Sequence, residues 1–205
     1  MKGDFNNQQT FFKQQNLDER KIIGADLTHD DKVMIVNSET TLRMIPNCDA
    51  LITADKNCLL TVTVADCLPI YFYDPKKQVV ALAHAGWKGV LNGIAQKTAL
   101  SLINNFSCDS NDIKIFIGPH IQKCHFEVKD DVASQFAPKY IIESAGKKYI
   151  NLAAAVKNQL LNIELPTSNI SISPDCTFCL ENKYFSFRRE SDKIVKAMVA
   201  YIGLN

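Results

Sequence analysis

Short apolar runs separated by polar turns mark the middle of the chain. Three of these runs are rich in β-branched or aromatic residues and too short for buried helices, so we expect buried strands at Leu59–Ala65, Pro69–Tyr73 and Val79–Ala83. The turn sequence Asp74–Lys77 separates the second run from the third. These two strands are therefore expected to form a hairpin in a central sheet.

Further helical and extended segments surround this hairpin. Apolar residues at helical spacing predict helices over Asn6–Asn16, Leu91–Phe106 and Leu152–Ile163, with Phe11 and Phe12 facing inward in the first. Shorter apolar runs predict strands at Lys21–Leu27, Val33–Val36, Ile113–Ile117, Ile170–Ser173 and Tyr184–Phe187. The pattern indicates an α/β or α+β fold with a mixed β-sheet core and flanking helices. No composition shift marks a linker, so residues 1–205 are expected to form a single domain.

Composition and charge narrow the classes of partner. Hydrophobic residues make up 46% of the chain and charged residues 22%, as in ordinary globular proteins. Lys and Arg number 23 against 22 for Asp and Glu, so no excess charge attracts nucleic acid or an acidic membrane surface. The first residues are polar and no long apolar stretch follows, so we expect a cytoplasmic protein, either a monomer or a homodimer.

The cysteines predict thiols rather than disulfides. Their number, seven, is odd, and the chain has no export signal, which favours a reducing compartment. Cys176 and Cys179 have the Cys-x-x-Cys spacing of zinc sites, but the sequence has no second such pair. Both are therefore expected to be core thiols.

Reactive side chains follow three of the predicted strands. Asp66 and Cys67 come after one strand, His84 after another and His29 after a third. Two imidazoles and a thiolate are a ligand set of catalytic zinc sites, which leave a fourth position for water or substrate. A second interpretation is that His29 is a solvated loop residue, Cys67 a buried thiol and His84 a core residue, and the spacing alone does not decide between the two.

Three other segments are candidates for binding substrate or an anion. His84–Gly89 places small residues and Lys88 between a strand and a helix, where amides and a positive charge would cradle phosphate, although a tight turn explains the same residues. Gly118 and His120 follow another strand and either line the same crevice or reverse the chain. Arg188 and Arg189 either bind an anionic group or are solvated.

Six motifs occur in an order that resembles the laccase-domain family, formerly called multicopper polyphenol oxidases and later assigned as purine nucleoside phosphorylases with adenosine deaminase activity. The motifs are Thr63–Ile70, His84–Gly89, Ile117–Ile121, Phe126–Val128, Cys176–Thr177 and Tyr184–Arg189. The resemblance implies a zinc enzyme, with copper as the alternative metal, that cleaves adenosine or inosine with phosphate. It also implies that the metal ligands are His29, Cys67 and His84.

We assign roles to the remaining candidates from the chemistry of these reactions. Asp66, Cys67 and His84 would be catalytic, and Asp66 or Glu127 would carry the proton in a deamination. The residues expected to bind nucleoside and phosphate are Lys88, Gly118, His120, Arg188 and Arg189. At the first ligand the match is partial, because Asp30 follows His29 where the family usually has glycine.

Two family segments have no counterpart in this sequence. Members usually begin with a Thr-Arg-x-Gly-Gly segment, and they continue after the double arginine to Thr-Gly-Arg, where this sequence has Glu190–Lys193. These two differences lead to three alternative expectations: weakened phosphate binding, altered substrate choice, or a protein that binds nucleoside without turnover. Two different enzymes also remain open: a copper polyphenol oxidase, for which one cysteine and two histidines are too few ligands, and a hydrolase with Cys67 as nucleophile and His84 as base.

Overall fold

The computed structural model describes residues 5–15, 17, 19–190 and 196–205, with residues 5–9 described only by their backbone. Asn16, the end of the first predicted helix, and Ser191–Lys193 lie outside the described residues. The helices are α1 (Phe5–Gln14), α2 (Trp87–Leu91), α3 (Ile94–Phe106), α4 (Asp130–Ala133) and α5 (Leu152–Leu161), with 3₁₀ turns η1 (Pro138–Tyr140) and η2 (Thr167–Asn169).

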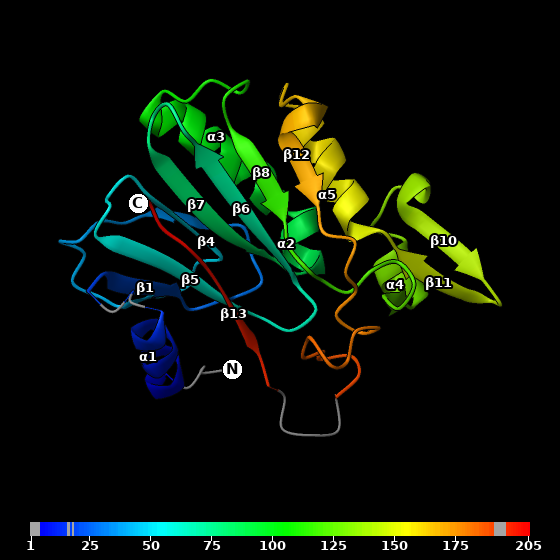
Figure 1. The fold of residues 1–205 in the computed structure, drawn as a ribbon. Coiled ribbons are helices and arrows are strands. Elements are labelled where there is room, and N and C mark those ends of the chain that lie inside the picture. The colour runs from blue at the N-terminus through cyan, green and yellow to red at the C-terminus, as the bar shows by residue number, and fades with distance from the viewer. Residues whose placement is uncertain (1–4, 16, 18, 191–195) are drawn as a thin grey trace.

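The strands of the described residues form three sheets (Figure 1). The six-stranded sheet has the order β12 (Ile170–Ile172), β8 (Lys114–Ile117), β6 (Leu68–Asp74), β7 (Val79–Ala85), β4 (Ala50–Thr53) and β2 (Val33–Ile35). The four-stranded sheet has the order β13 (Met198–Ile202), β5 (Cys58–Val64), β1 (Lys21–Ala25) and β3 (Met44–Ile45). The three-stranded sheet has the order β10 (Ile141–Ser144), β11 (Lys147–Ile150) and β9 (Glu127–Val128). Parallel pairs such as β1–β5 occur beside antiparallel pairs such as β6–β7, which confirms the predicted mixed sheet.

The predicted hairpin is confirmed and lies at the centre of the six-stranded sheet. Successive residues of a strand point to opposite faces. Ile70 and Phe72 of β6 accordingly pack in one core, whereas Tyr71 and Tyr73 pack against a second core on the opposite face. Both faces of this sheet are covered, which explains why its strands are continuous apolar runs rather than alternating ones.

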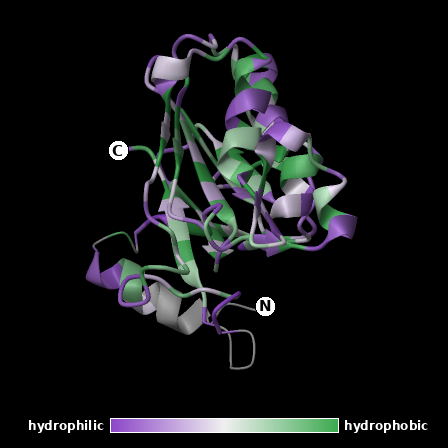
Figure 2. Ribbon diagram, turned by 90° about the vertical axis from the view of Figure 1, so that its right-hand side faces the viewer, coloured by the Kyte–Doolittle hydropathy of each residue, from purple (hydrophilic) through white to green (hydrophobic). Residues whose placement is uncertain are grey.

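Helices and a second sheet cover these two faces. Residues of α3 and α5 belong to the first core, and residues of β1 and β5 belong to the second, so the order of layers is helices, six-stranded sheet, four-stranded sheet (Figure 1). Hydrophobic residues follow the strands through the middle of the molecule, and hydrophilic residues gather in the outer loops (Figure 2). Among the described residues, no helix combines the length and apolar character needed to cross a membrane.

Two predictions about local structure are wrong. Tyr184–Phe187 forms no strand, because the chain turns here: the Tyr184 amide donates to the carbonyl oxygen of Leu180, and the Ser186 hydroxyl donates to a buried carboxylate rather than to a sheet. In α1, Phe12 is fully buried, but Phe11 is 40% exposed. Consecutive residues of a helix point about 100° apart, and here only the Phe12 ring points into the interior.

Candidate metal centre

The fold brings three predicted ligands together: His29, Cys67 and His84. His84 is the penultimate residue of β7, Cys67 lies in the connection between β5 and β6, and His29 lies in the loop after β1. One potential ligand atom of each residue lies within 4.8 Å of the others. The residues are 38 and 17 positions apart in the sequence, and only the pairing of the strands makes them neighbours.

Buried Asp49, directly before β4, organises two of these residues. Its Oδ1 accepts hydrogen bonds from the backbone amide of His29 and from Nδ1 of His84, both at 2.9 Å. Its Oδ2 accepts from the backbone amides of Thr28 and Asp30 at 3.0 Å and from the Thr28 hydroxyl. Asp49 is not among the residues predicted from the sequence; the available signal was a charged residue at the edge of an otherwise apolar strand.

The three residues and Asp49 shift one another's protonation. Burial raises the pKa of Cys67, but hydrogen bonds and charge from His29 and His84 outweigh it and bring the value down from 9.0 to about 7. Burial lowers the pKa of His84, but Asp49 and Cys67 outweigh it and raise the value from 6.5 to about 9. Burial raises the pKa of Asp49, but the bond from His84 and the amides reverse this and lower it to about 2. Thiolate, imidazolium and carboxylate therefore coexist near neutral pH in the metal-free protein.

The donor set fits a metal ion. Because Nδ1 of His84 is bonded to Asp49, its Nε2 is left as the metal-facing atom, and a carboxylate behind a ligating histidine is a common support of zinc sites. The rings of His29 and His84 lie 4.8 Å apart at 88°, edge to face. Gly86 packs against the cluster: a Cβ at this position would lie 3.0 Å from Cδ2 of His29 and 3.2 Å from Sγ of Cys67. The residues present could therefore hold one metal ion, at a place where the backbone leaves little spare room.

A cavity of about 730 Å³ adjoins this cluster, and all three cluster residues line it. Other lining residues come from the ends of β1 and β5 and from three aromatic side chains, Trp87, Phe126 and Phe187. Arg188 also lines the cavity, with its guanidinium 5.5 Å from the centre of the Phe126 ring. The site thus combines a metal-ligand set, an apolar and aromatic wall and one positive charge.

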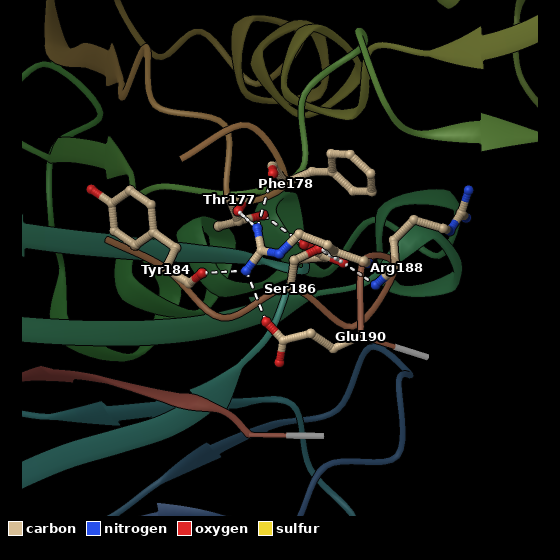
Figure 3. A network of polar contacts seen from close by, with 8 residues as sticks. Thr177, Phe178, Tyr184, Ser186, Arg188 and Glu190 are labelled. Atoms are coloured by element: carbon tan, nitrogen blue, oxygen red, sulfur yellow. Dashed lines mark hydrogen bonds and ion pairs between the residues drawn. The ribbon is translucent and has the colours of Figure 1, made fainter. Parts of the chain in front are cut away.

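Asp66 ties the loop that carries Arg188 to the loop that carries Cys67. Its carboxylate accepts from the hydroxyl of Thr177 at 2.6 Å, from the hydroxyl of Ser186 at 2.9 Å and from the backbone amide of Arg188 at 2.7 Å. Asp66 itself is buried and has a positive φ of 86°. Figure 3 shows Thr177, Ser186 and Arg188 converging in this network.

Arg189 secures the same loop from the other side. Its guanidinium donates to the carbonyl oxygens of Thr177, Phe178 and Tyr184 and forms an ion pair with Glu190 (Figure 3). A side chain with four such partners cross-links the loop. Of the two adjacent arginines, Arg188 is thus the one that lines the cavity.

The other predicted binding residues lie elsewhere. Within the described part of the chain, the cavity lining does not include Lys88, Gly118 or His120. Lys88 is exposed, with Nζ 5.6 Å from the centre of the Trp87 ring. A Cβ at Gly118 would lie 2.9 Å from Pro69, so this glycine permits close packing. His120 is buried, its Nδ1 is 2.8 Å from the carbonyl oxygen of Gly118, and burial lowers its pKa.

Two further predictions concern residues away from the cavity. Glu127 forms an ion pair with Lys147 at 2.9 Å and is not among the described residues that line the cavity. Cys176 is buried as predicted for a core thiol, but Cys179 is exposed, so that prediction is wrong for Cys179. The cause is a hydrogen-bonded turn over 176–180, which carries Cys179 to the surface.

Comparisons with known proteins give consistent results. Residues 5–205 match the family described as multi-copper polyphenol oxidoreductase laccase. A purine nucleoside phosphorylase of Bacteroides thetaiotaomicron is 32% identical over 167 residues, which cover 78% of this chain and 62% of the relative. Purine nucleoside phosphorylase YlmD of Geobacillus stearothermophilus is 36% identical over 167 residues, 78% of this chain and 61% of the relative. The chain therefore spans about three fifths of the length of these two relatives.

A solved structure has the same fold. The crystal structure of the Bacillus licheniformis hypothetical protein YfiH superposes with a TM-score of 0.90 at 30% sequence identity, covering 98% of this chain and 80% of that one. The agreement therefore extends over nearly all of the present chain.

Proposed function

The chain belongs to the multi-copper polyphenol oxidoreductase laccase family, and from this premise we propose that it is a zinc-dependent purine nucleoside phosphorylase that acts on adenosine and inosine. The observation that carries the proposal is the position of His29, Cys67 and His84 in the wall of a cavity that also contains aromatic side chains and Arg188. The names of the two relatives support the choice of reaction. All seven cysteines are free thiols, which supports a cytoplasmic location.

The cavity suits a nucleoside in size and in lining. Its volume of about 730 Å³ lies within the range of small-molecule sites. Phe126 and Phe187 offer ring faces on which a purine can stack, an interaction that contributes roughly 1–3 kcal/mol per base in other proteins. Arg188, the arginine in the cavity wall, is suited to bind phosphate. Its Nη1 donates to the carbonyl oxygen of Glu127 at 2.7 Å, which holds the guanidinium in place, and its other N–H groups can donate to phosphate oxygens.

Phosphorolysis needs a held base, a held phosphate and a dry site. The bond between the base and C1′ of the ribose breaks and an oxygen of hydrogen phosphate forms the new bond to C1′. The proton that hydrogen phosphate gives up balances the one that the leaving base takes up. Positive charge develops on the sugar, so phosphate held by Arg188 stabilises it as well as attacking. Zinc, when bound, supplies a Lewis acid at this end of the cavity. The contact between Nδ1 of His84 and Asp49 orients the ring so that Nε2 faces this end of the cavity.

Adenosine deamination would need a carboxylate free to move a proton. Asp66 accepts three hydrogen bonds within the protein, and Glu127 is paired with Lys147. We therefore assign Asp66 a positioning role and propose phosphorolysis as the main reaction.

One observation favours a second candidate, a Cys–His hydrolase. In the metal-free protein Cys67 has a pKa of about 7 and two histidines beside it, which is the arrangement of an activated thiol nucleophile. Metal content separates the two candidates, because a zinc-bound thiolate is a poor free nucleophile. A polyphenol oxidase binds several copper ions, and this three-residue cluster has too few ligands for them.

The decisive experiment incubates zinc-loaded protein with adenosine or inosine, with and without phosphate, and separates the products by chromatography. Free base and ribose 1-phosphate, formed only with phosphate, are the expected products. Ammonia without base release would replace phosphorolysis by deamination. Binding of nucleoside without any product would replace the enzyme by a binding protein, and the Cys67→Ala variant, which removes one proposed ligand, is the negative control for every arm.

A further inference from the structure

A second cluster of metal-binding side chains lies away from the cavity. Cys124 and His125 follow β8, and Cys176 and Cys179 lie in the turn after β12. One potential ligand atom of each lies within 4.8 Å of the others. Sγ of Cys124 is 3.7 Å from Sγ of Cys176 and 3.7 Å from Sγ of Cys179. Nδ1 of His125 is 3.3 Å from Sγ of Cys124 and 3.2 Å from Sγ of Cys179.

These distances match the edges of a tetrahedron around zinc. With Zn–S bonds of about 2.3 Å and Zn–N bonds of about 2.0–2.1 Å, tetrahedral geometry places two sulfurs about 3.8 Å apart and a sulfur and a nitrogen about 3.5 Å apart. The four separations in the protein, 3.7, 3.7, 3.3 and 3.2 Å, lie within about 0.3 Å of these values. A disulfide needs about 2.05 Å between sulfurs, so the thiols are arranged as separate ligands.

The surrounding backbone and an aromatic ring hold the four side chains in this arrangement. His120 and Cys176 form a parallel bridge, and the amide of Thr177 donates to the carbonyl oxygen of His120 at 3.1 Å, which joins the two loops. The amide of Gln122 points at Sγ of Cys176 at 3.4 Å, a contact that supports a ligating thiolate. The ring of His125 stacks on Phe178 with centroids 4.1 Å apart and a 16° angle, which fixes the orientation of Nδ1.

We propose that Cys124, His125, Cys176 and Cys179 bind a second, structural zinc ion. Three cysteines and one histidine form a closed four-ligand set, which leaves no position for substrate. This inference does not rest on the proposed enzyme activity, since it follows from a separate group of side chains.

The second zinc would support the loop behind the candidate active site. Thr177 lies between the ligands Cys176 and Cys179, and its hydroxyl donates to Asp66 beside Cys67. Arg189 donates to the carbonyl oxygens of Thr177 and Phe178, in the same turn (Figure 3). A metal that fixes this turn thus also fixes the partners of Asp66. Stability and metal content, rather than turnover, report this role directly.

The test is the zinc content of the purified, reduced protein. We expect about two zinc ions per wild-type chain and about one in the double variant Cys124→Ser/Cys179→Ser, which changes only exposed thiols. Cys67→Ala should also retain about one, from the second cluster. Cys108→Ala, which changes a buried thiol outside both clusters, is the matched control and should keep two.

Cobalt substitution identifies which site remains. Cobalt-loaded Cys67→Ala would have three thiolate ligands and should absorb strongly in the thiolate-to-metal region, whereas the Cys124→Ser/Cys179→Ser variant would have one and absorb weakly. The unfolding temperature of the double variant should be lower than that of the wild type. In wild-type protein stripped of zinc, the unfolding temperature should rise when zinc is restored.

Three outcomes would overturn the inference. One is a wild-type content of one zinc that Cys124→Ser/Cys179→Ser leaves unchanged. Another is loss of all zinc in a folded Cys67→Ala chain. The third is a disulfide among these cysteines in the protein purified without reductant while the zinc content is unchanged. If the double variant does not fold, His125→Gln, which removes one half-exposed ligand, replaces it in the same comparison.

Discussion

The Nδ1 atom of His84 lies 2.9 Å from Oδ1 of Asp49, and both side chains are buried. The same carboxylate accepts a hydrogen bond from the backbone amide of His29, so one residue orients two of the three candidate ligands. Replacing Asp49 by Asn removes the negative charge and leaves the Asn NH₂ group facing donors. We expect Asp49→Asn to weaken zinc binding roughly 10- to 100-fold, as other losses of a carboxylate behind a ligating histidine do.

Competition with a chromogenic chelator measures this change. Asp74→Asn is the matched control, because Asp74 is also fully buried, lies at the end of β6 and accepts backbone amides of Lys76 and Lys77 far from the cluster. The control should lose stability without losing zinc affinity. Equal affinity of wild type and Asp49→Asn would mean that the histidines are held by other contacts.

Gly86 leaves room for the cluster. A Cβ at this position would meet Cδ2 of His29 at 3.0 Å and Sγ of Cys67 at 3.2 Å. Gly86→Ala should therefore displace at least one ligand and reduce bound zinc, with a smaller effect on the unfolding temperature. Gly146→Ala is the control: it lies at a positive φ with no atom within 4 Å of its added Cβ, so it should lower stability through the backbone alone and leave the zinc content unchanged.

The reactivity of Cys67 should depend on pH in a defined direction. Burial raises its pKa, but His29 and His84 outweigh burial and lower the value to about 7, so the thiolate is present above about pH 7 and is lost by protonation below it. In metal-free protein, alkylation of the Cys67 peptide should fall as the pH drops through about 7, because only the thiolate reacts. In the same metal-free sample Cys124 should show no midpoint near pH 7, since burial and the neighbouring thiols raise its pKa to about 12.

Peptide mass spectrometry after iodoacetamide pulses resolves the two cysteines in one sample. Added zinc should suppress the labelling of Cys67, because metal and proton compete for the same thiolate. An alkylation midpoint near the ordinary thiol value of 9.0 would contradict the proposed contacts of Cys67 with the histidines.

The central sheet was predictable because its strands carry their own signal. The hairpin of β6 and β7 is an apolar run, a turn and an apolar run, and local sequence contains all three. Cys67 and His84 were found for the same reason: they lie where those runs end. The position of His29 beside them depends on the loop after β1, whose conformation is set by Asp49 from 20 residues away.

Other parts of the two clusters could not be found from local patterns. Cys124 lies 52 residues before Cys176, with His125 next to it, and only the pairing of β8 with β12 and the bridge from His120 bring these residues together. Local spacing therefore revealed only one half of a four-ligand set. The prediction of a strand at Tyr184–Phe187 was wrong for a related reason: a distant carboxylate, Asp66, accepts hydrogen bonds from the Ser186 hydroxyl and the Arg188 amide.

Asp66 provides a test of positioning against proton transfer. Asp66→Ala would leave the hydroxyls of Thr177 and Ser186 and the amide of Arg188 without their acceptor, and we expect a loss of about 3 kcal/mol of stability. Asp66→Asn can accept from Ser186 and Arg188 through its oxygen and donate to Thr177 through its NH₂ group, so it should cost about 1 kcal/mol. A positioning residue would retain turnover in the Asn variant.

Chemical denaturation and steady-state assays of the two variants separate the roles. A proton carrier would lose turnover in Asp66→Asn while stability stays near that of the wild type. That result would return Asp66 to the catalytic role predicted from the sequence. Thr177→Val, which removes one donor to the same carboxylate, serves as the control for lost hydrogen bonding alone.

Phosphate recognition should depend on Arg188 rather than on Lys88. Both were predicted to bind phosphate, but Arg188 lines the cavity, whereas Lys88 is not among the described residues that line it. Losing a charge-assisted hydrogen bond costs about 1.5–3 kcal/mol, so Arg188→Ala should raise the KM for phosphate roughly tenfold or more while changing the KM for nucleoside little. Lys88→Ala should leave both values near those of the wild type. Initial rates at varied phosphate and fixed inosine give these constants, and the zinc content of each variant shows whether the metal centre is intact. The opposite pattern, a phosphate defect in Lys88→Ala alone, would place the anion at the start of α2 instead of beside Phe126.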